Sequence, residues 1–131
     1  MTLYRVGRNS PIVKALLEAI DMVINEPERR QRLWENQRYF IEAMGAAGLS
    51  VTCTDTPILP FHVGDETDCL RIAGGLEAAG YHVDAITFPA IPLGQSRLRF
   101  MMNAGHTRAQ IDGAVGALAH LSRELHVAPI A

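Results

Sequence analysis

The chain has 131 residues, of which 48% are hydrophobic and 20% charged, and its 14 acidic side chains slightly outnumber its 12 basic ones. This length allows one domain with a buried core, and the composition excludes a disordered chain. No apolar run reaches the roughly 20 residues of a membrane-spanning helix, and the N-terminus lacks the apolar centre of a signal peptide, so we expect a cytoplasmic protein. The net charge of −2 argues against a nucleic-acid partner.

The first part of the chain predicts two helices. Pro11 follows a serine, a typical helix N-terminus, and apolar residues then recur at helical spacing as far as Asn25. Pro27 ends that run and begins a second helix with acidic residues in its first turn. A glycine at position 45 or 48 is expected to end the second helix.

The middle of the chain predicts strands on either side of a third helix. The segments Leu49–Cys53 and Ile58–Val63 have the short, alternating or apolar pattern of strands. Asp65 can cap a helix that Gly80 ends, and Tyr81–Ile86 reads as a further strand.

The last part predicts a loop, a strand and a helix. The two prolines of Phe88–Gly94 favour an extended loop, and Ser96–Met102 is the clearest strand of the sequence. Thr107 and Gln110 form a capping box before an apolar stripe that continues to Leu125. The whole order predicts an α+β fold, in which helices cover one face of a small, mainly antiparallel sheet.

Two arginines on the last predicted strand are the first candidate site. Arg97 and Arg99 share one face because side chains alternate along a strand. Two guanidinium groups behind a loop rich in proline could bind a carboxylate or phosphate. The alternative is that both arginines pair with acidic side chains on the surface.

The histidines and cysteines give weaker signals. His106 lies directly before the Thr107 cap, where it could line a site or simply hydrogen bond to the local backbone. Cys53 and Cys69 lack the spacing of a zinc site and are expected to be small core residues, so we predict no metal.

Several motifs together resemble the C-terminal domain of the α-oxoamine synthases, which are fold-type I enzymes that use pyridoxal phosphate (PLP). This family includes aminooxononanoate synthase, aminoketobutyrate CoA ligase and serine palmitoyltransferase. The resemblance covers Pro11 to about Leu125. The motifs that carry it are Thr56–Pro60, Val63–Asp65, Leu76–Val83, Phe88–Arg99 and Asn103–Thr107.

The resemblance implies an activity and a site. Enzymes of this family condense an amino acid with an acyl-CoA, in most cases with loss of carbon dioxide, and they work as homodimers with the active site between subunits. By this resemblance Arg99 binds the carboxylate of the amino acid substrate, Arg97 supports it, and Pro89, Ile91 and Pro92 line the substrate channel. His106 is a possible further lining residue.

The resemblance also implies that part of such an enzyme is absent here. The family's Schiff-base lysine lies upstream, in a large domain, within a glycine-flanked motif. The one lysine of this chain, Lys14, lies instead in an amphipathic helix, where a surface lysine is the simpler interpretation. Residues 1–10 are then a segment leading from a missing large domain, residues 11–131 form one domain, and no covalently bound PLP is expected.

Two functional hypotheses follow. The first is that the chain is the C-terminal domain of a PLP-dependent acyl-CoA:amino acid C-acyltransferase, binds the substrate carboxylate and is not catalytic alone. The second is a free-standing, non-catalytic α+β module that binds a small carboxylate or a protein partner. Both allow self-association through the apolar first helix, so a homo-oligomer is expected.

Overall fold

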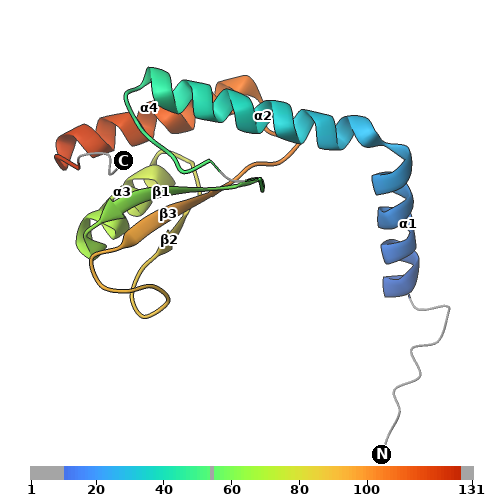
Figure 1. Cartoon of the computed structure of the whole chain (residues 1–131), viewed down its shortest axis with the longest axis horizontal. Helices are drawn as coiled ribbons and strands as arrows, with labels where there is room; N and C mark the ends of the chain where they lie inside the picture. The colour runs from blue at the N-terminus through green and yellow to red at the C-terminus, as the bar shows by residue number, and fades with distance from the viewer. Residues whose placement is uncertain (1–10, 54, 128–131) are drawn as a thin grey trace, which may run out of the picture.

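The computed structural model describes residues 11–53 and 55–127, in which four helices and three strands form the fold predicted from the sequence (Figure 1). The predicted segment 1–10 lies outside the described residues. In chain order the elements are α1 (Pro11–Asn25), α2 (Pro27–Ala46), β1 (Ile58–Gly64), α3 (Glu66–Ala78), β2 (Asp84–Ile86), β3 (Ser96–Met101) and α4 (Arg108–Glu124).

The sheet is antiparallel throughout, with β3 between β1 and β2. Its register creates two cross-strand rows of side chains on one face. One row consists of Pro60, Arg99 and Asp84, and the other of His62, Arg97 and Ile86. None of these side chains is buried, so this face, which we call the open face, is not covered by the helices.

The opposite face of the sheet and the helices form the core. Helix α3 contacts all three strands, and α4 packs against both α2 and α3. The fully buried apolar side chains come from both layers, and the largest of them are Phe40, Met44, Leu59, Phe61, Ile72, Leu76, Leu98 and Leu118. The prediction of helices on one face of a small antiparallel sheet is therefore confirmed.

The predicted N-terminal caps of α3 and α4 are also confirmed, whereas the serine before Pro11 lies outside the described residues. The Asp65 side chain accepts a hydrogen bond from the Asp68 amide at 3.0 Å, and Thr107 and Gln110 form a reciprocal capping box. Helices α3 and α4 approach closely at Gly75, where an added Cβ would lie 2.7 Å from a methyl group of Leu121. A larger residue at Gly75 would therefore require the Leu121 side chain to move.

The predicted strand Leu49–Cys53 is wrong. This segment lies beside the outer edge of β1, where the Thr52 amide donates to the Pro60 carbonyl at 3.2 Å. In an antiparallel ladder the two paired residues exchange both hydrogen bonds, but proline has no N–H to donate in return. Pro60 therefore stops the pairing after one bond, although Leu49 still packs into the core.

The predicted strand Tyr81–Ile86 is right only for its second half. The Tyr81 amide donates to the Leu76 carbonyl at 2.8 Å, which holds Tyr81 at the end of α3. Its ring lies over α4, where a Cβ at Gly113 would come within 2.0 Å of the Tyr81 hydroxyl. This packing draws Tyr81 away from β3, so pairing starts at Asp84.

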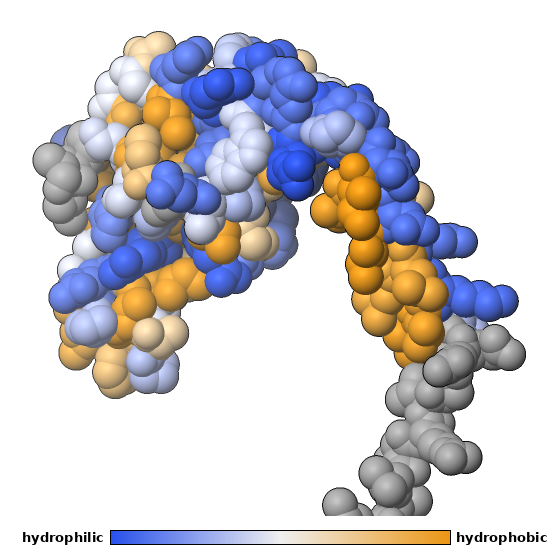
Figure 2. All heavy atoms as spheres, turned by 45° about the vertical axis from the view of Figure 1, so that its right-hand side comes forward, coloured by the Kyte–Doolittle hydropathy of each residue, from blue (hydrophilic) through white to orange (hydrophobic). Residues whose placement is uncertain are grey.

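Helix α1 differs from the rest of the fold because none of its residues is buried. It is joined to the N-terminal end of α2 and extends apart from the sheet (Figure 1). Figure 2 shows its apolar side chains as one surface turned toward the rest of the molecule across an open space. The members of this α1 apolar surface are Ile12, Leu16, Leu17, Ile20, Val23 and Ile24, each more than half exposed.

Within the described residues, no helix combines the length and the apolar character that crossing a membrane requires.

Candidate functional site

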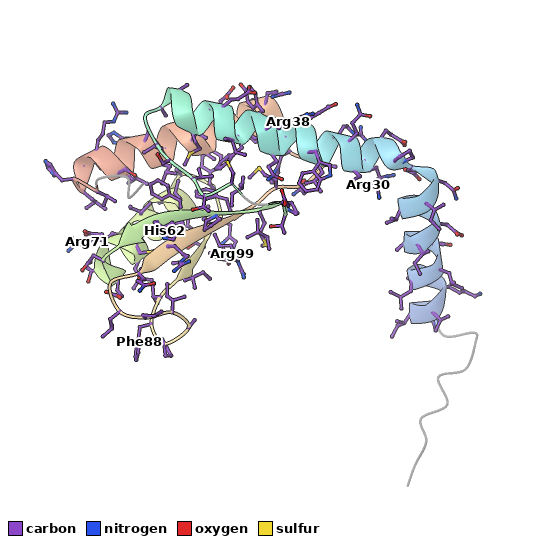
Figure 3. All side chains as sticks on the ribbon, in the orientation of Figure 1. Arg30, Arg38, His62, Arg71, Phe88 and Arg99 are labelled. Carbon is purple, nitrogen blue, oxygen red and sulfur yellow. The ribbon has the colours of Figure 1, made fainter. Side chains whose placement is uncertain are left out.

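The structure places both candidate arginines on the open face, as their spacing predicted. Arg99 is in the middle of β3, between Pro60 and Asp84, and its side chain is 43% exposed. Arg97 lies one row closer to the β2–β3 loop, between His62 and Ile86. Figure 3 shows Arg99 and His62 on the sheet and Phe88 beyond its end. The central strand thus carries two cations on an uncovered surface.

Arg99 forms an ion pair across the strands. Its Nη2 donates to Oδ2 of Asp84 at 2.8 Å, and this hydrogen bond is the first reason why the pKa of Asp84 lies below its ordinary value. The charge of Arg99 and the nearby His82, whose Nε2 is 3.6 Å from Oδ1 of Asp84, lower that pKa further, while desolvation opposes them. The alternative that a surface acid pairs with the arginine is therefore correct for Arg99.

This ion pair does not use all of the binding capacity of Arg99. Asp84 receives one hydrogen bond from Nη2, and a guanidinium has further N–H donors arranged to hold a carboxylate at two points. Asp84 is therefore a carboxylate already bound by Arg99, and it shows that the guanidinium can bind this group on the open face.

Arg97 is held by its own loop. Its Nε donates to the Gln95 carbonyl at 3.3 Å. In the part of the chain described here this is its one hydrogen bond, and no carboxylate pairs with it. The Arg97 guanidinium therefore adds positive charge to the open face without an acidic partner.

The predicted substrate loop is the connection between β2 and β3. It contains Pro89, Ile91 and Pro92 and extends beyond the Ser96 end of β3, next to Arg97. Its apolar side chains are largely uncovered, with Phe88 58% and Leu93 70% exposed. The loop therefore joins β3 at its Ser96 end, and the two arginines lie further along the same strand.

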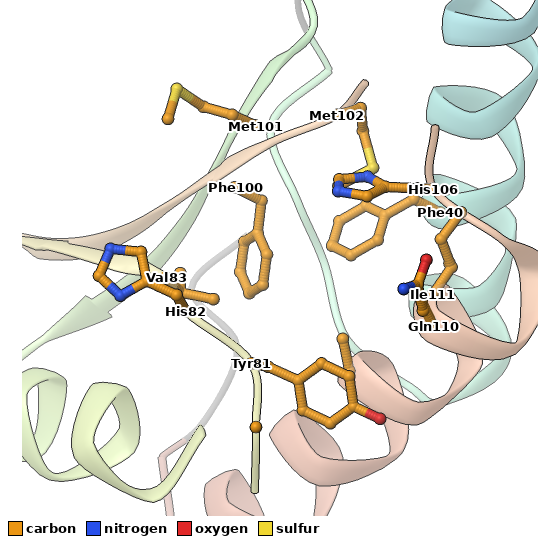
Figure 4. A pocket seen from close by; sticks show the side chains of 12 residues that line it. Phe40, Tyr81, His82, Val83, Phe100, Met101, Met102, His106, Gln110 and Ile111 are labelled. Atoms are coloured by element: carbon orange, nitrogen blue, oxygen red, sulfur yellow. The ribbon is translucent and has the colours of Figure 1, made fainter. Parts of the chain in front are cut away.

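His106 lies elsewhere. It follows the opposite end of β3 and lines a hollow of about 360 Å³ where Tyr81–Val83 separates from the sheet (Figure 4). Neither arginine nor any residue of the loop lines this hollow. The His106 ring is bonded locally, with Nε2 2.9 Å from Nδ2 of Asn103, and its carbonyl accepts from Asn36 at 2.9 Å. The interpretation as a turn histidine therefore fits better than a site with Arg99.

The two cysteines and the lysine differ in how deeply they are buried. Cys69 is buried, as predicted, and burial raises the pKa of its thiol to about 11, with a smaller contribution from Glu66. Cys53 is exposed, so its prediction as a core residue is wrong. Lys14 is exposed on α1. The described residues contain no group of three His, Cys, Asp or Glu side chains that could hold a metal ion.

Sequence reasoning missed two acidic residues near this site. Asp84 lay inside a predicted strand whose partner was unknown, so its position beside Arg99 could not be read from spacing. Glu66 accepts a hydrogen bond from the Gly94 amide, 28 residues further along the chain, at 2.6 Å. Its position directly after the Asp65 cap was the only available signal.

Comparison with known proteins identifies the family. The family model described as aminotransferase class I and II matches residues 8–118. The chain belongs to this family. Its resemblance to the α-oxoamine synthases is confirmed as well, because the relatives that it matches carry the names of these enzymes.

Two curated relatives show the extent of the similarity. The 8-amino-7-oxononanoate synthase of Symbiobacterium thermophilum is 37% identical over 123 residues, which are 94% of this chain and 31% of that protein. The 2-amino-3-ketobutyrate coenzyme A ligase of Escherichia coli is 38% identical over 116 residues, or 88% of this chain and 29% of that protein. The chain thus spans about a third of the length of these family members.

Solved structures agree on the fold. A serine palmitoyltransferase from S. paucimobilis, described with a bound PLP–myriocin aldimine, has a TM-score of 0.76 and 29% identity, covering 85% of this chain and 28% of that one. An 8-amino-7-oxononanoate synthase from Francisella tularensis has a TM-score of 0.75 at 24% identity, covering 88% and 34%. The chain matches the C-terminal part of these structures.

Proposed function

We propose that this chain acts as the C-terminal part of a PLP-dependent α-oxoamine synthase and that Arg99 binds the carboxylate of its amino acid substrate. The acyl donor is an acyl-CoA, as in the family. The observation that carries this proposal is the position of Arg99, in a family member, at the centre of the open face, with Arg97 between it and the Pro-rich loop.

The pairing of Arg99 with Asp84 supports a role in carboxylate binding. The substrate carboxylate is the same chemical group as the one that Arg99 already holds at 2.8 Å. Because the pair is exposed, water can replace either partner at little cost, so a substrate can compete with Asp84 or share the guanidinium with it. Asp84 would then keep Arg99 oriented while the site is empty of substrate.

The residues present do not fit the cofactor by themselves. When bound, PLP supplies an electron sink for carbanion chemistry, and it needs a lysine inside a pocket. The one lysine of the chain, Lys14, is exposed on α1, and no hydrogen bond or ion pair holds it in the described residues. We therefore infer that another part of the intact enzyme supplies the lysine and that the 131-residue chain is inactive alone.

The loop between β2 and β3 completes the proposed site. Its exposed apolar side chains, Phe88 and Leu93, together with the partly exposed Ile91, suit the lining of a channel for the substrate or its acyl group. The missing contact surfaces of the site are supplied by the rest of the enzyme and by a second subunit. The α1 apolar surface supports such an assembly, because an apolar patch of this extent is typical of an interface.

Calorimetric titration tests the carboxylate site directly. We expect acetate and L-alanine to bind the 131-residue chain saturably at millimolar concentration, and Arg99→Ala to abolish this binding. Arg71→Ala is the matched control, because Arg71 is an exposed arginine on α3 with only a distant ion pair to Asp68 at 3.7 Å. Binding that survives in Arg99→Ala, or no binding by the unaltered chain, would contradict the proposal.

Replacement of Asp84, which competes with the ligand for Arg99, should raise the affinity for the ligand. Asp84→Ala leaves the Arg99 guanidinium without its carboxylate partner. We expect this variant to bind acetate more tightly than the unaltered chain. A weaker affinity in Asp84→Ala would mean that Asp84 is needed for the site and does not compete with the ligand.

A further inference from the structure

The β2–β3 loop has one hydrogen bond to a helix among the bonds of the described residues. Three of its bonds are internal, from Ala90 N to Thr87 O at 3.0 Å, from Gln95 N to Pro92 O at 3.3 Å and from Thr87 Oγ1 to Phe88 O at 3.4 Å. Another runs from the Gly94 amide to Oε1 of Glu66 at 2.6 Å. Without this bond the loop would be attached to the fold mainly through the two strands at its ends.

Glu66 is free to make this bond because another residue caps its helix. It is the first residue of α3, and the preceding Asp65 already accepts the Asp68 amide at 3.0 Å. The Glu66 carboxylate therefore points to a donor outside the helix, and the positive end of the helix dipole attracts its charge. A charged acceptor makes a stronger hydrogen bond to a backbone N–H than a neutral one.

Gly94 is where the loop turns back into β3. Its φ of +74° lies in the left-handed region, which glycine adopts readily and other residues rarely do. The next residue, Gln95, accepts the hydrogen bond from Arg97 at 3.3 Å. One short segment of backbone therefore connects the Glu66 carboxylate to the Arg97 guanidinium.

We propose that Glu66 is a positioning residue, which holds the β2–β3 loop beside Arg97 and Arg99 through the Gly94 amide. This role rests on the proposed function, because it assumes that the loop contacts the substrate bound at Arg99. Glu66 itself touches neither arginine in the hydrogen bonds found; it acts through the loop backbone.

Exchange of the Gly94 amide proton, followed by NMR in the full 131-residue chain, tests the bond. In Glu66→Ala we expect exchange at Gly94 to be roughly five-fold faster and its amide proton to shift upfield, because the charged acceptor is lost. Glu66→Gln keeps an acceptor oxygen and should restore part of the protection. Glu77→Gln, an exposed residue on the same helix, is the matched control and should change neither signal.

Titration of the same variants with L-alanine tests the positioning role. We expect Glu66→Ala to weaken binding several-fold and Glu66→Gln to restore most of it, with Glu77→Gln unchanged. If the Gly94 amide exchanges at the same rate in all variants, the hydrogen bond to Glu66 is refuted. If exchange is faster in Glu66→Ala but the affinity for L-alanine is unchanged, the positioning role is refuted. An unaltered chain that binds no L-alanine overturns the proposed function and the positioning role together, while the Gly94 signal still reports separately on the bond.

Discussion

Helices α1 and α4 have similar sequence patterns but opposite environments. Both carry apolar residues at helical spacing, yet α4 buries Ile111, Val115 and Leu118, whereas α1 buries nothing. The difference in burial does not come from the apolar character of the two helices, because α1 has the more apolar sequence. It shows that an amphipathic pattern predicts a helix and a face that needs covering, but not the element that covers it. For α4 the covering elements are α2 and α3; for α1 we propose another part of the enzyme or a second copy.

The largest expected effect compares one leucine in each helix. Leu118→Ala removes a fully buried side chain and should lower the free energy of unfolding by about 2–5 kcal/mol. Leu17→Ala, at a side chain that is 57% exposed, should change it by no more than about 0.5 kcal/mol. Urea unfolding of the two variants measures both values. Equal losses would show that α1 is already covered in the isolated chain.

The α1 apolar surface should also cause self-association. We expect the chain to form concentration-dependent oligomers in sedimentation velocity, because a contiguous exposed apolar surface favours burial against a second copy. Leu16→Glu should shift the chain to monomer. Leu70→Glu is the control, since Leu70 on α3 is an isolated leucine of nearly equal exposure, 57% against 58%. A chain that stays monomeric at high concentration would refute this expectation.

A smaller effect should appear as a pH dependence on the open face. The pKa of Asp84 is lowered by the hydrogen bond from Arg99, so the folded chain binds this proton less readily than the unfolded chain. The stabilisation is therefore present above the ordinary carboxyl pKa and is lost as the pH falls through the lowered value. The difference in unfolding free energy between the unaltered chain and Asp84→Asn should shrink on acidification. A difference independent of pH would rule out the ion pair as its source.

Much of the fold could be predicted because local signals agreed with the final packing. The caps at Asp65 and Thr107 placed the starts of α3 and α4, and the alternation of the predicted strand Ser96–Met102 placed Arg97 and Arg99 on one face. The two strand errors arose from tertiary effects. Pro60 cannot return a hydrogen bond to Thr52, and packing against Gly113 draws Tyr81 away from β3.

The site was predicted less completely than the fold. The arginines lie on one strand, so the period of the strand was enough to bring them together. The acidic residues Asp84 and Glu66 act across elements, at sequence separations of 15 and 28 residues from their partners. His106 was grouped with the arginines by family resemblance, but it follows the far end of β3 and bonds to Asn103. Contacts of this kind depend on strand order and loop path, which no local pattern encodes.

The most direct test of the central claim is the activity of a chimeric synthase. The 131-residue chain would replace the matching third of the S. thermophilum 8-amino-7-oxononanoate synthase, which is 37% identical to it. We predict that the chimera has measurable synthase activity, that Arg99→Ala abolishes it and that Arg71→Ala preserves it. A folded chimera without activity, or one in which Arg99→Ala remains fully active, would contradict the account. The first of these results would favour the free-standing carboxylate-binding module.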